Sequence, residues 1–314
     1  MKSRGGGSGV PHRQDGNPDG QSVASGSPAP PIDGQIQHLE LPGRRLRRSF
    51  RLLAEVTDAA TTAALLARFS SDQAAAVQFE ISMLGRGLNA LKVVRLLCQK
   101  GHWEFAVSAV RQLFELVLNL EQIDAASDRQ AAIARYETFA LLQKLRREVE
   151  TLEYDKKSGR PVDEERLVTG VRLLDDDVFA EFRERRRNGR TVWAVSWSGK
   201  NAWEMAQASP APLRRDQYHL LFVAWSEQVH AAPAAVLHHM FRSRDTVEEV
   251  IALDDVRIAE TIASALTHFL ELWSLVATIP GPDPRTAERW YRRILSEAAR
   301  VGSPGQAPRR QRRA

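Results

Sequence analysis

The stretch from Ala106 to Leu120 is apolar in almost every direction around a helix, and it restricts the fold more than any other part of the chain. At about 100° per residue, its polar side chains fall on one narrow stripe. These side chains belong to Ser108, Arg111, Gln112, Glu115 and Asn119. Because apolar neighbours must cover the other sides, the stretch predicts a helix at the centre of a bundle.

Helical spacing of apolar residues recurs along most of the remaining chain. Asp128, Asp254 and the pair Asp283-Pro284 have the chemistry of helix starts. The segment 191–197 alternates apolar residues, but we expect an ordered loop because it has no evident partner strand. We therefore predict an all-α, multi-helix bundle. The main helices are expected over 43–69, 72–101, 102–124, 128–154, 175–187, 216–230, 254–278 and 284–302, with short helices after Asp163 and over 198–207.

Both ends of the chain have a composition unlike the middle. Residues 1–42 are rich in Gly, Pro and Ser, and residues 302–314 are basic. Neither segment has enough apolar side chains to form a core, so we predict disordered tails on either side of one helical domain over 43–301. We expect no secretory leader and no membrane span, since Glu271 interrupts the longest apolar stretch.

The positive charge is concentrated at the C-terminal end. The net charge is +5, and five arginines with no acidic residue follow from Arg300 onward, so the rest is balanced. We therefore expect nucleic acid to bind only weakly, through the basic C-terminal tail. The single cysteine, Cys98, excludes a disulfide framework and is typical of a reducing compartment such as the cytoplasm. We expect it to be buried.

The motifs of the common enzyme classes are missing from the sequence. There is no phosphate-binding glycine loop, dinucleotide fingerprint, His-Glu-x-x-His pair or nucleophile elbow. His238 and His239 could suggest a metal site together with His230. Adjacent histidines point about 100° apart on a helix, however, and no carboxylate lies at ligand spacing. We expect neither a metal nor a cofactor, and the sequence does not decide whether the protein is an enzyme.

Two polar stripes are candidates for a functional site. Arg111 and Glu115 lie one turn apart on the central helix, either facing water or pointing into a polar pocket. Ser226 and His230 lie one turn apart on the helix predicted over 216–230. A protonated His230 is favoured by the dipole at a helix C-terminus, or it faces the first stripe. Our candidate polar cluster is Arg111, Glu115, Ser226 and His230.

Both segments resemble a bacterial domain-of-unknown-function family, number 5677. The helix Arg-Gln-Leu-Phe-Glu at 111–115 resembles the family's Arg-x-x-x-Glu helix. Trp-Ser-Gly-Lys at 197–200, followed by Tyr218 and by Ser226 with His230, resembles its second signature. The resemblance covers about 59–240. It implies an all-α fold and a shared polar cluster, and no particular reaction.

A broader likeness is to nucleotide-binding helical bundles, many of which are ribonucleases. Their signature places an arginine four to six residues before a histidine, but 223–225, upstream of His230, hold Val, Ala and Trp. Two hypotheses therefore follow. The chain is a cytoplasmic helical binding or regulatory module of unknown partner, or it is a metal-independent ribonuclease that uses His230 for proton transfer and Arg111 to stabilise the phosphorane.

Overall fold

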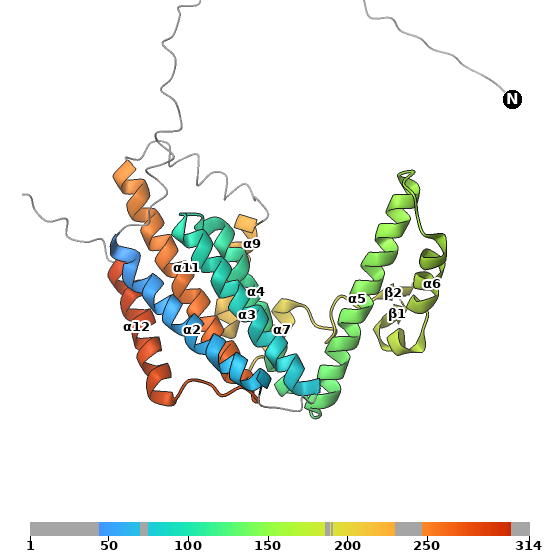
Figure 1. The fold of residues 1–314 in the computed structure, drawn as a ribbon, viewed down its shortest axis with the longest axis horizontal. Helices are drawn as coiled ribbons and strands as arrows, with labels where there is room; N and C mark the ends of the chain where they lie inside the picture. The colour runs from blue at the N-terminus through green and yellow to red at the C-terminus, as the bar shows by residue number, and fades with distance from the viewer. Residues whose placement is uncertain (1–43, 70–74, 186–188, 190, 230–246, 303–314) are drawn as a thin grey trace, which may run out of the picture. The chain divides into compact units, whose positions relative to one another are not determined.

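The fold is described by a computed structural model over residues 44–69, 75–185, 189, 191–229 and 247–302 (Figure 1). It is an all-α multi-helix bundle, as predicted. The predicted tails lie outside the described residues, apart from Gly302. The segment with His230, His238 and His239 lies outside them as well. The elements in chain order are η1 (Arg44–Leu46), α2 (Arg47–Phe69), α3 (Ala75–Gln99), α4 (Trp103–Asp124), α5 (Arg129–Lys157), α6 (Glu164–Leu174), η2 (Asp177–Phe182), β1 (Arg183–Arg185), β2 (Thr191–Trp193), α7 (Ala202–Ala208), α8 (Arg214–Gln217), η3 (Tyr218–Val223), α9 (Ala224–Val229), α11 (Val247–Leu275) and α12 (Pro284–Gly302).

The core lies among α2, α3, α4, α11 and α12, and α4 is central to it. α4 packs most extensively on α11 and α3, which cover its apolar sides. Gly87, in α3, permits a close approach to α11, because a Cβ atom there would lie 2.5 Å from Leu272 Cδ2 and 3.2 Å from the Phe269 ring. The prediction of a central helix over 102–124 is therefore confirmed.

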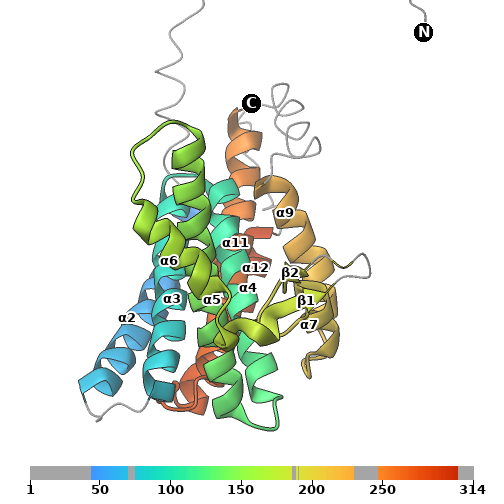
Figure 2. The same cartoon turned by 90° about the vertical axis from the view of Figure 1, so that its right-hand side faces the viewer.

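The segment from α5 to β2 lies to one side of this core (Figures 1 and 2). α6 packs along α5, and η2 packs against α5 as well. Phe182, at the end of η2, is fully buried with its ring 5.2 Å from that of Phe139 in α5. This apolar anchor holds the short β1–β2 hairpin next to α5.

The structure corrects the predicted helix over 175–187. Asp176 caps a 3-10 turn by accepting a hydrogen bond from the Val178 amide at 2.9 Å, and the chain then enters β1. β1 pairs antiparallel with β2, and Arg183 faces Trp193 in the register. The prediction of a loop over 191–197 was thus wrong at its start. The partner strand β1 lies within the charged residues for which the sequence predicts a helix.

The predicted helix starts at Asp128 and Asp283 and the short helix after Asp163 are confirmed, whereas the predicted start at Asp254 is wrong. The carboxylates of Asp128, Asp163 and Asp283 accept hydrogen bonds from the backbone amides of Ala131, Arg166 and Thr286, each at 3.0 Å. Asp254 instead lies inside α11, where its carboxylate accepts a 3.0 Å hydrogen bond from Trp103 Nε1. Asp254 therefore makes a tertiary hydrogen bond and does not mark the start of the helix.

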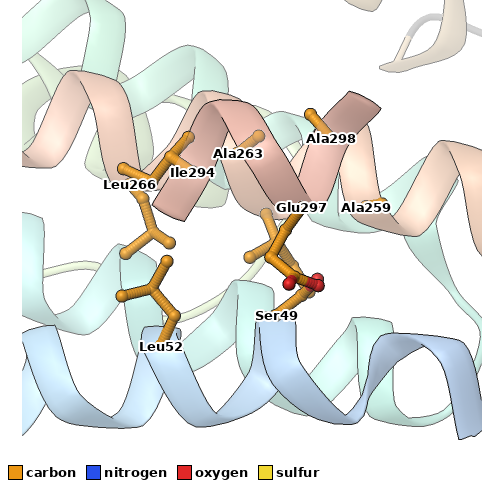
Figure 3. Close-up of a pocket in the computed structure, with 9 residues that line it drawn as sticks. Ser49, Leu52, Ala259, Ala263, Leu266, Ile294, Glu297 and Ala298 are labelled. Atoms are coloured by element: carbon orange, nitrogen blue, oxygen red, sulfur yellow. The ribbon is translucent and has the colours of Figure 1, made fainter. Parts of the chain in front are cut away.

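A small cavity lies inside the described part of the bundle. A cavity of about 10 Å³ lies among Ser49, Leu266 and Ile294, between α2, α11 and α12 (Figure 3). This volume accommodates about one water molecule. Of the described helices, none combines the length and apolar character needed to cross a membrane. Cys98 is fully buried in α3, as predicted.

Candidate functional site

Arg111 and Glu115 form an ion pair on α4, with 3.4 Å between Arg111 Nε and Glu115 Oε1. The Arg111 side chain is 26% exposed and that of Glu115 is 43% exposed, so the pair is neither fully buried nor freely solvated. Burial raises the pKa of the Glu115 carboxyl, and the charge and hydrogen bond of Arg111 offset only part of this effect. Glu115 is therefore a carboxylate that is costly to ionise.

Arg111 also contacts the helix that carries Ser226. Its guanidinium carbon lies 4.2 Å from the centre of the Phe222 ring, a cation–π contact. Phe222 belongs to η3, a π-helical stretch, and π-helical turns are frequent at functional sites. The Ser226 hydroxyl donates to the Phe222 carbonyl at 2.8 Å. In the described part of the chain, no hydrogen bond joins Ser226 to Arg111 or Glu115.

Glu115 lines a cavity of about 340 Å³ on the side of α4 that faces α5. The walls come from α4, α5, α7 and the segment between β2 and α7. They consist of Glu115, Asn119, Tyr136, Phe139, Ala140, Gln143, Val195, Ser196, Trp197, Ala202 and Met205. Aromatic and aliphatic walls with a few polar groups, in a volume of this order, are typical of small-molecule sites. We call this space the Glu115 cavity.

Trp197 closes one wall of the Glu115 cavity and is held by α4. Its indole Nε1 donates a 2.6 Å hydrogen bond to Asn119 Oδ1, and the Asn119 amide donates to the Glu115 carbonyl at 2.8 Å. The Trp197 ring meets Tyr136 of α5 edge to face at 5.6 Å. The Asn119 amide is thus satisfied, so its role is to position Trp197.

The turn after Trp197 is fixed by backbone conformation and by Lys200. Gly199 adopts a φ of +72°, which side chains other than glycine rarely allow. The Lys200 ammonium donates to Gln122 Oε1 on α4 at 2.8 Å. A second cavity of about 340 Å³ lies here, and Trp197 lines both cavities. The Trp-Ser-Gly-Lys motif therefore separates two surface cavities.

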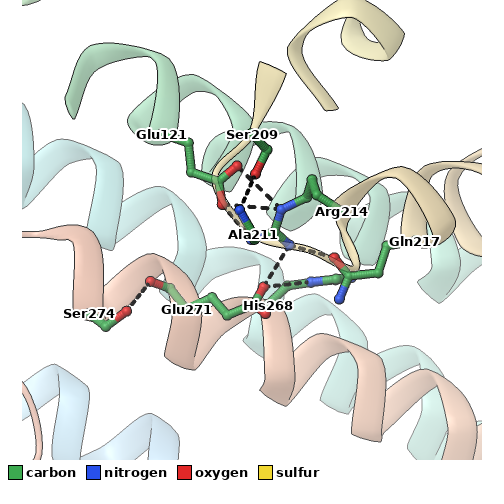
Figure 4. A network of polar contacts seen from close by, with 8 residues as sticks. All are labelled: Glu121, Ser209, Ala211, Arg214, Gln217, His268, Glu271 and Ser274. Atoms are coloured by element: carbon green, nitrogen blue, oxygen red, sulfur yellow. Dashed lines mark hydrogen bonds and ion pairs between the residues drawn. The ribbon is translucent and has the colours of Figure 1, made fainter. Parts of the chain in front are cut away.

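A second Arg–Glu cluster, which the sequence analysis missed, lies deeper in the bundle (Figure 4). Arg214 is 3% exposed, and its Nη2 lies 2.6 Å from Glu121 Oε1 on α4. Its Nη1 contacts Glu271 Oε2 on α11 at 2.9 Å and Gln217 Oε1 at 2.6 Å. His268 Nδ1 lies 3.2 Å from the same Glu271 oxygen. We call these five residues the Arg214 network.

The charges of the Arg214 network stabilise one another. Burial lowers the pKa of Arg214, but the bonds and charges of Glu121 and Glu271 raise it overall. Burial likewise raises the pKa of Glu271, whereas His268 and Arg214 together lower it overall. A sequence signal for the network existed: Glu121 directly follows the apolar run of α4, and Glu271 interrupts that of α11. Charges in such apolar surroundings need buried partners.

The described residues contain no group of three or more His, Cys, Asp or Glu side chains arranged to hold a metal ion. The two clusters that they do contain, around Glu115 and around Arg214, both draw on α4 and on the segment 197–218. These are the segments whose motifs suggested a family.

Comparison with known proteins agrees with this assignment. Residues 79–247 match a family of unknown function, DUF5677. No curated protein and no solved structure matches the chain. The matched region covers more than half of the sequence and includes α4 and the Trp-Ser-Gly-Lys turn. It also includes both polar clusters, apart from Glu271 and His268, which lie on α11. The chain therefore belongs to the family of unknown function DUF5677.

Proposed function

We propose that this protein is a helical binding module that holds a small polar ligand in the Glu115 cavity. The observation that carries the proposal is a half-buried carboxylate in a cavity of ligand size. Of the candidate cluster Arg111, Glu115, Ser226 and His230, we assign ligand contact to Glu115 and orientation of its carboxylate to Arg111. The lone thiol of the chain is typical of a cytoplasmic protein.

The polar groups of the Glu115 cavity indicate the chemistry of the ligand. The Glu115 carboxylate accepts hydrogen bonds and favours a cation or an N–H donor. The Tyr136 hydroxyl and the Gln143 amide have no hydrogen-bond partner among the described residues and can serve further polar atoms. Phe139 and Met205 provide apolar contact. A small molecule with an amine or amide donor at one end of an apolar body fits this lining.

A thermal-shift screen of small amines and amides tests the proposal. A ligand present at about one hundred times its Kd stabilises the native state by about 2.7 kcal/mol, a readily measured shift. We expect stabilisation of the wild type that is lost in Glu115→Gln, which keeps the shape of the side chain and removes its charge. Glu137→Gln is the matched control, because Glu137 is exposed on α5 and does not line the cavity. Equal shifts for wild type and Glu115→Gln would contradict the proposal.

The second candidate function is metal-independent ribonuclease activity with His230 and Arg111. It is favoured by the contact of Arg111 with Phe222, because α9 continues from η3 to the residue before His230. Expression of the wild type should then be toxic, and both His230→Ala and Arg111→Ala should relieve the toxicity and abolish cleavage of RNA by the purified protein. Cleavage that survives both substitutions would exclude this assignment.

A further inference from the structure

The cavity beside the Trp-Ser-Gly-Lys turn has no part in the proposed function. Its volume is about 340 Å³, and it shares the Trp197 side chain with the Glu115 cavity. Three segments form its walls: the end of α4 with the residues that follow it, the first two turns of α5, and the turn itself. We call this space the Lys200 cavity. Its polar lining residues are Gln122, Ser127, Asp128, Arg135, Ser198 and Lys200.

The Lys200 ammonium is a positioned cation without an acidic partner. It donates to Gln122 Oε1 on α4 at 2.8 Å, and it forms no ion pair with any residue that the structure describes. Its backbone is held as well, because the Ser196 hydroxyl donates to the Lys200 carbonyl at 2.7 Å. An ammonium has three N–H donors, so two of those of Lys200 are open to a ligand.

The other open hydrogen-bonding groups of the Lys200 cavity are mainly donors. Because Gln122 Oε1 accepts from Lys200, the NH₂ group is the open end of the Gln122 amide. Neither that NH₂ group nor the Ser127 hydroxyl makes a hydrogen bond within the described part of the chain. The Ser198 hydroxyl oxygen already accepts from the Lys200 backbone amide at 3.2 Å. The cavity wall therefore offers more donors than acceptors.

Arg135 brings a second cation to the Lys200 cavity, from α5. Its Nε lies 3.1 Å from Glu181 Oε2, and its guanidinium carbon lies 5.6 Å from the centre of the Phe182 ring. These contacts position the guanidinium, and Glu181 offsets part of its charge. The terminal nitrogens of Arg135 make no hydrogen bond to a described residue, so their N–H groups are open to a ligand.

The carboxylate that lines the Lys200 cavity, that of Asp128, is engaged by the backbone of α5. Its Oδ1 accepts a 3.0 Å hydrogen bond from the Ala131 amide as the N-cap, and the positive end of the helix dipole favours its charge. In the Glu115 cavity, by contrast, an acid is the only charged residue among those that line it in the described structure. The two cavities that meet at Trp197 thus differ in electrostatic character.

We propose that the Lys200 cavity binds a small molecule through an oxyanion, either a phosphate or a carboxylate group. Such a group offers only acceptors to a wall whose open groups are donors. Lys200 and Arg135 supply charge-assisted hydrogen bonds from two different segments. The volume accommodates more than a bare ion, and the Trp197 ring provides an apolar wall for the rest of the molecule. This proposal does not depend on a ligand in the Glu115 cavity.

Isothermal titration calorimetry of the full chain tests the proposal, with phenyl phosphate and benzoate as probes. These probes carry the two oxyanions on the same apolar ring, and benzyl alcohol is the uncharged control. Sodium chloride keeps the ionic strength constant, so that screening is equal in all titrations. We expect saturable binding of at least one anionic probe. Lys200→Gln and Arg135→Gln should each raise its Kd by about tenfold or more, because each removes a charged hydrogen-bond donor.

The matched controls are Lys144→Gln and Arg147→Gln, which make the same changes on α5. Both side chains are exposed and line neither cavity, so these variants should bind like the wild type. Circular dichroism checks folding, and the two site variants alter different segments, so a defect in one leaves the other as a test.

Binding of one anionic probe alone would support the proposal and identify the group that the Lys200 cavity accepts. The proposal is wrong if the wild type binds neither anionic probe, if benzyl alcohol binds as tightly as they do, or if the site and control variants have equal Kd values.

Discussion

The two Arg–Glu clusters on α4 differ in burial although their glutamates are only six residues apart. In the Arg214 network, Arg214 is 3% exposed and Glu121 is 5% exposed, and three acceptors surround the guanidinium. The side chains of the Arg111–Glu115 pair are partly exposed, and the Glu115 carboxylate lines a cavity. A buried ion-pair network contributes to the unique packing of a fold, whereas an exposed pair next to a cavity is available to a ligand.

The pKa values of Glu115 and of Glu271, the α11 member of the Arg214 network, show the same difference. Burial raises the pKa of both carboxyl groups. The partners of Glu271 bring its pKa below the ordinary value, whereas Arg111 does not do so for Glu115. Incomplete compensation of a buried charge is typical of functional sites. We therefore expect substitutions in the Arg214 network to affect stability and substitutions at Glu115 to affect binding.

The largest expected effect is that of Arg214→Ala on stability. The substitution leaves Glu121 buried without its cation, and removal of one partner of a buried ion pair costs about 3–5 kcal/mol. Urea denaturation monitored by circular dichroism measures this cost. Arg215→Ala is the matched control, because Arg215 is the exposed neighbour on α8, and it should change stability by less than about 0.5 kcal/mol. Equal midpoints for the two variants would refute a structural role of the network.

Chemical labelling of Cys98 provides a second measure of the stability lost in Arg214→Ala. Burial raises the pKa of its thiol to about 12, and Cys98 is the only cysteine in the chain. A thiol reagent should therefore react only when the bundle opens. If labelling requires global unfolding, a loss of about 3–5 kcal/mol in Arg214→Ala speeds labelling by roughly two to four orders of magnitude. Arg215→Ala should label at the wild-type rate, and fast labelling of the wild type would show that α3 opens locally.

The helices and the family were predictable from the sequence because their signals are local. Apolar periodicity identified α4, and Asp128 and Asp283 marked true helix starts. The β1–β2 hairpin was missed because its pairing depends on Phe182, which is anchored on α5 and whose contacts are not local. An aspartate that accepts a tertiary hydrogen bond, such as Asp254, is indistinguishable from a cap by sequence alone.

The candidate site was predictable only in part, for a similar reason. The narrow stripe of α4 identified Arg111 and Glu115, but their partners lie on segments far along the chain: Phe222 in η3 and the Trp197 turn. Arg214 was missed because its own sequence surroundings are polar, and its burial results from Glu121 and Glu271. The contribution of His230 stays a prediction, since it lies outside the described residues.

A smaller effect on stability is expected for Glu115→Ala. The ion pair with Arg111 is partly exposed, so its loss should cost less than about 1 kcal/mol. The Arg111 guanidinium keeps its contact with the Phe222 ring and stays partly solvated. Urea denaturation of Glu115→Ala, with Glu137→Ala as the exposed control on α5, measures this cost. A loss of stability comparable with that of Arg214→Ala would show that Glu115 has a structural role like that of Arg214. The basis for the binding proposal would then be removed.

The pH dependence of stability should have opposite signs for Glu115 and Glu271. A raised native pKa means that the folded state holds the Glu115 proton more tightly than the unfolded state does. Ionisation of Glu115 therefore lowers stability as the pH rises above the ordinary value of 4.5. Glu115→Gln removes this dependence, so the variant should gain stability relative to the wild type as the pH rises through that window.

Glu271 should behave in the reverse manner, because its native pKa is lowered. Its ionised form stabilises the folded state above 4.5, and that contribution is lost as the pH falls through the lowered native pKa. The deficit of Glu271→Gln relative to the wild type should thus be largest near neutral pH and should shrink in acid. Unfolding free energies of both variants, measured in the same pH series, give the two slopes. Slopes of the same sign would show that the two carboxylates share one environment, and the distinction between a structural and a ligand-binding cluster would fail.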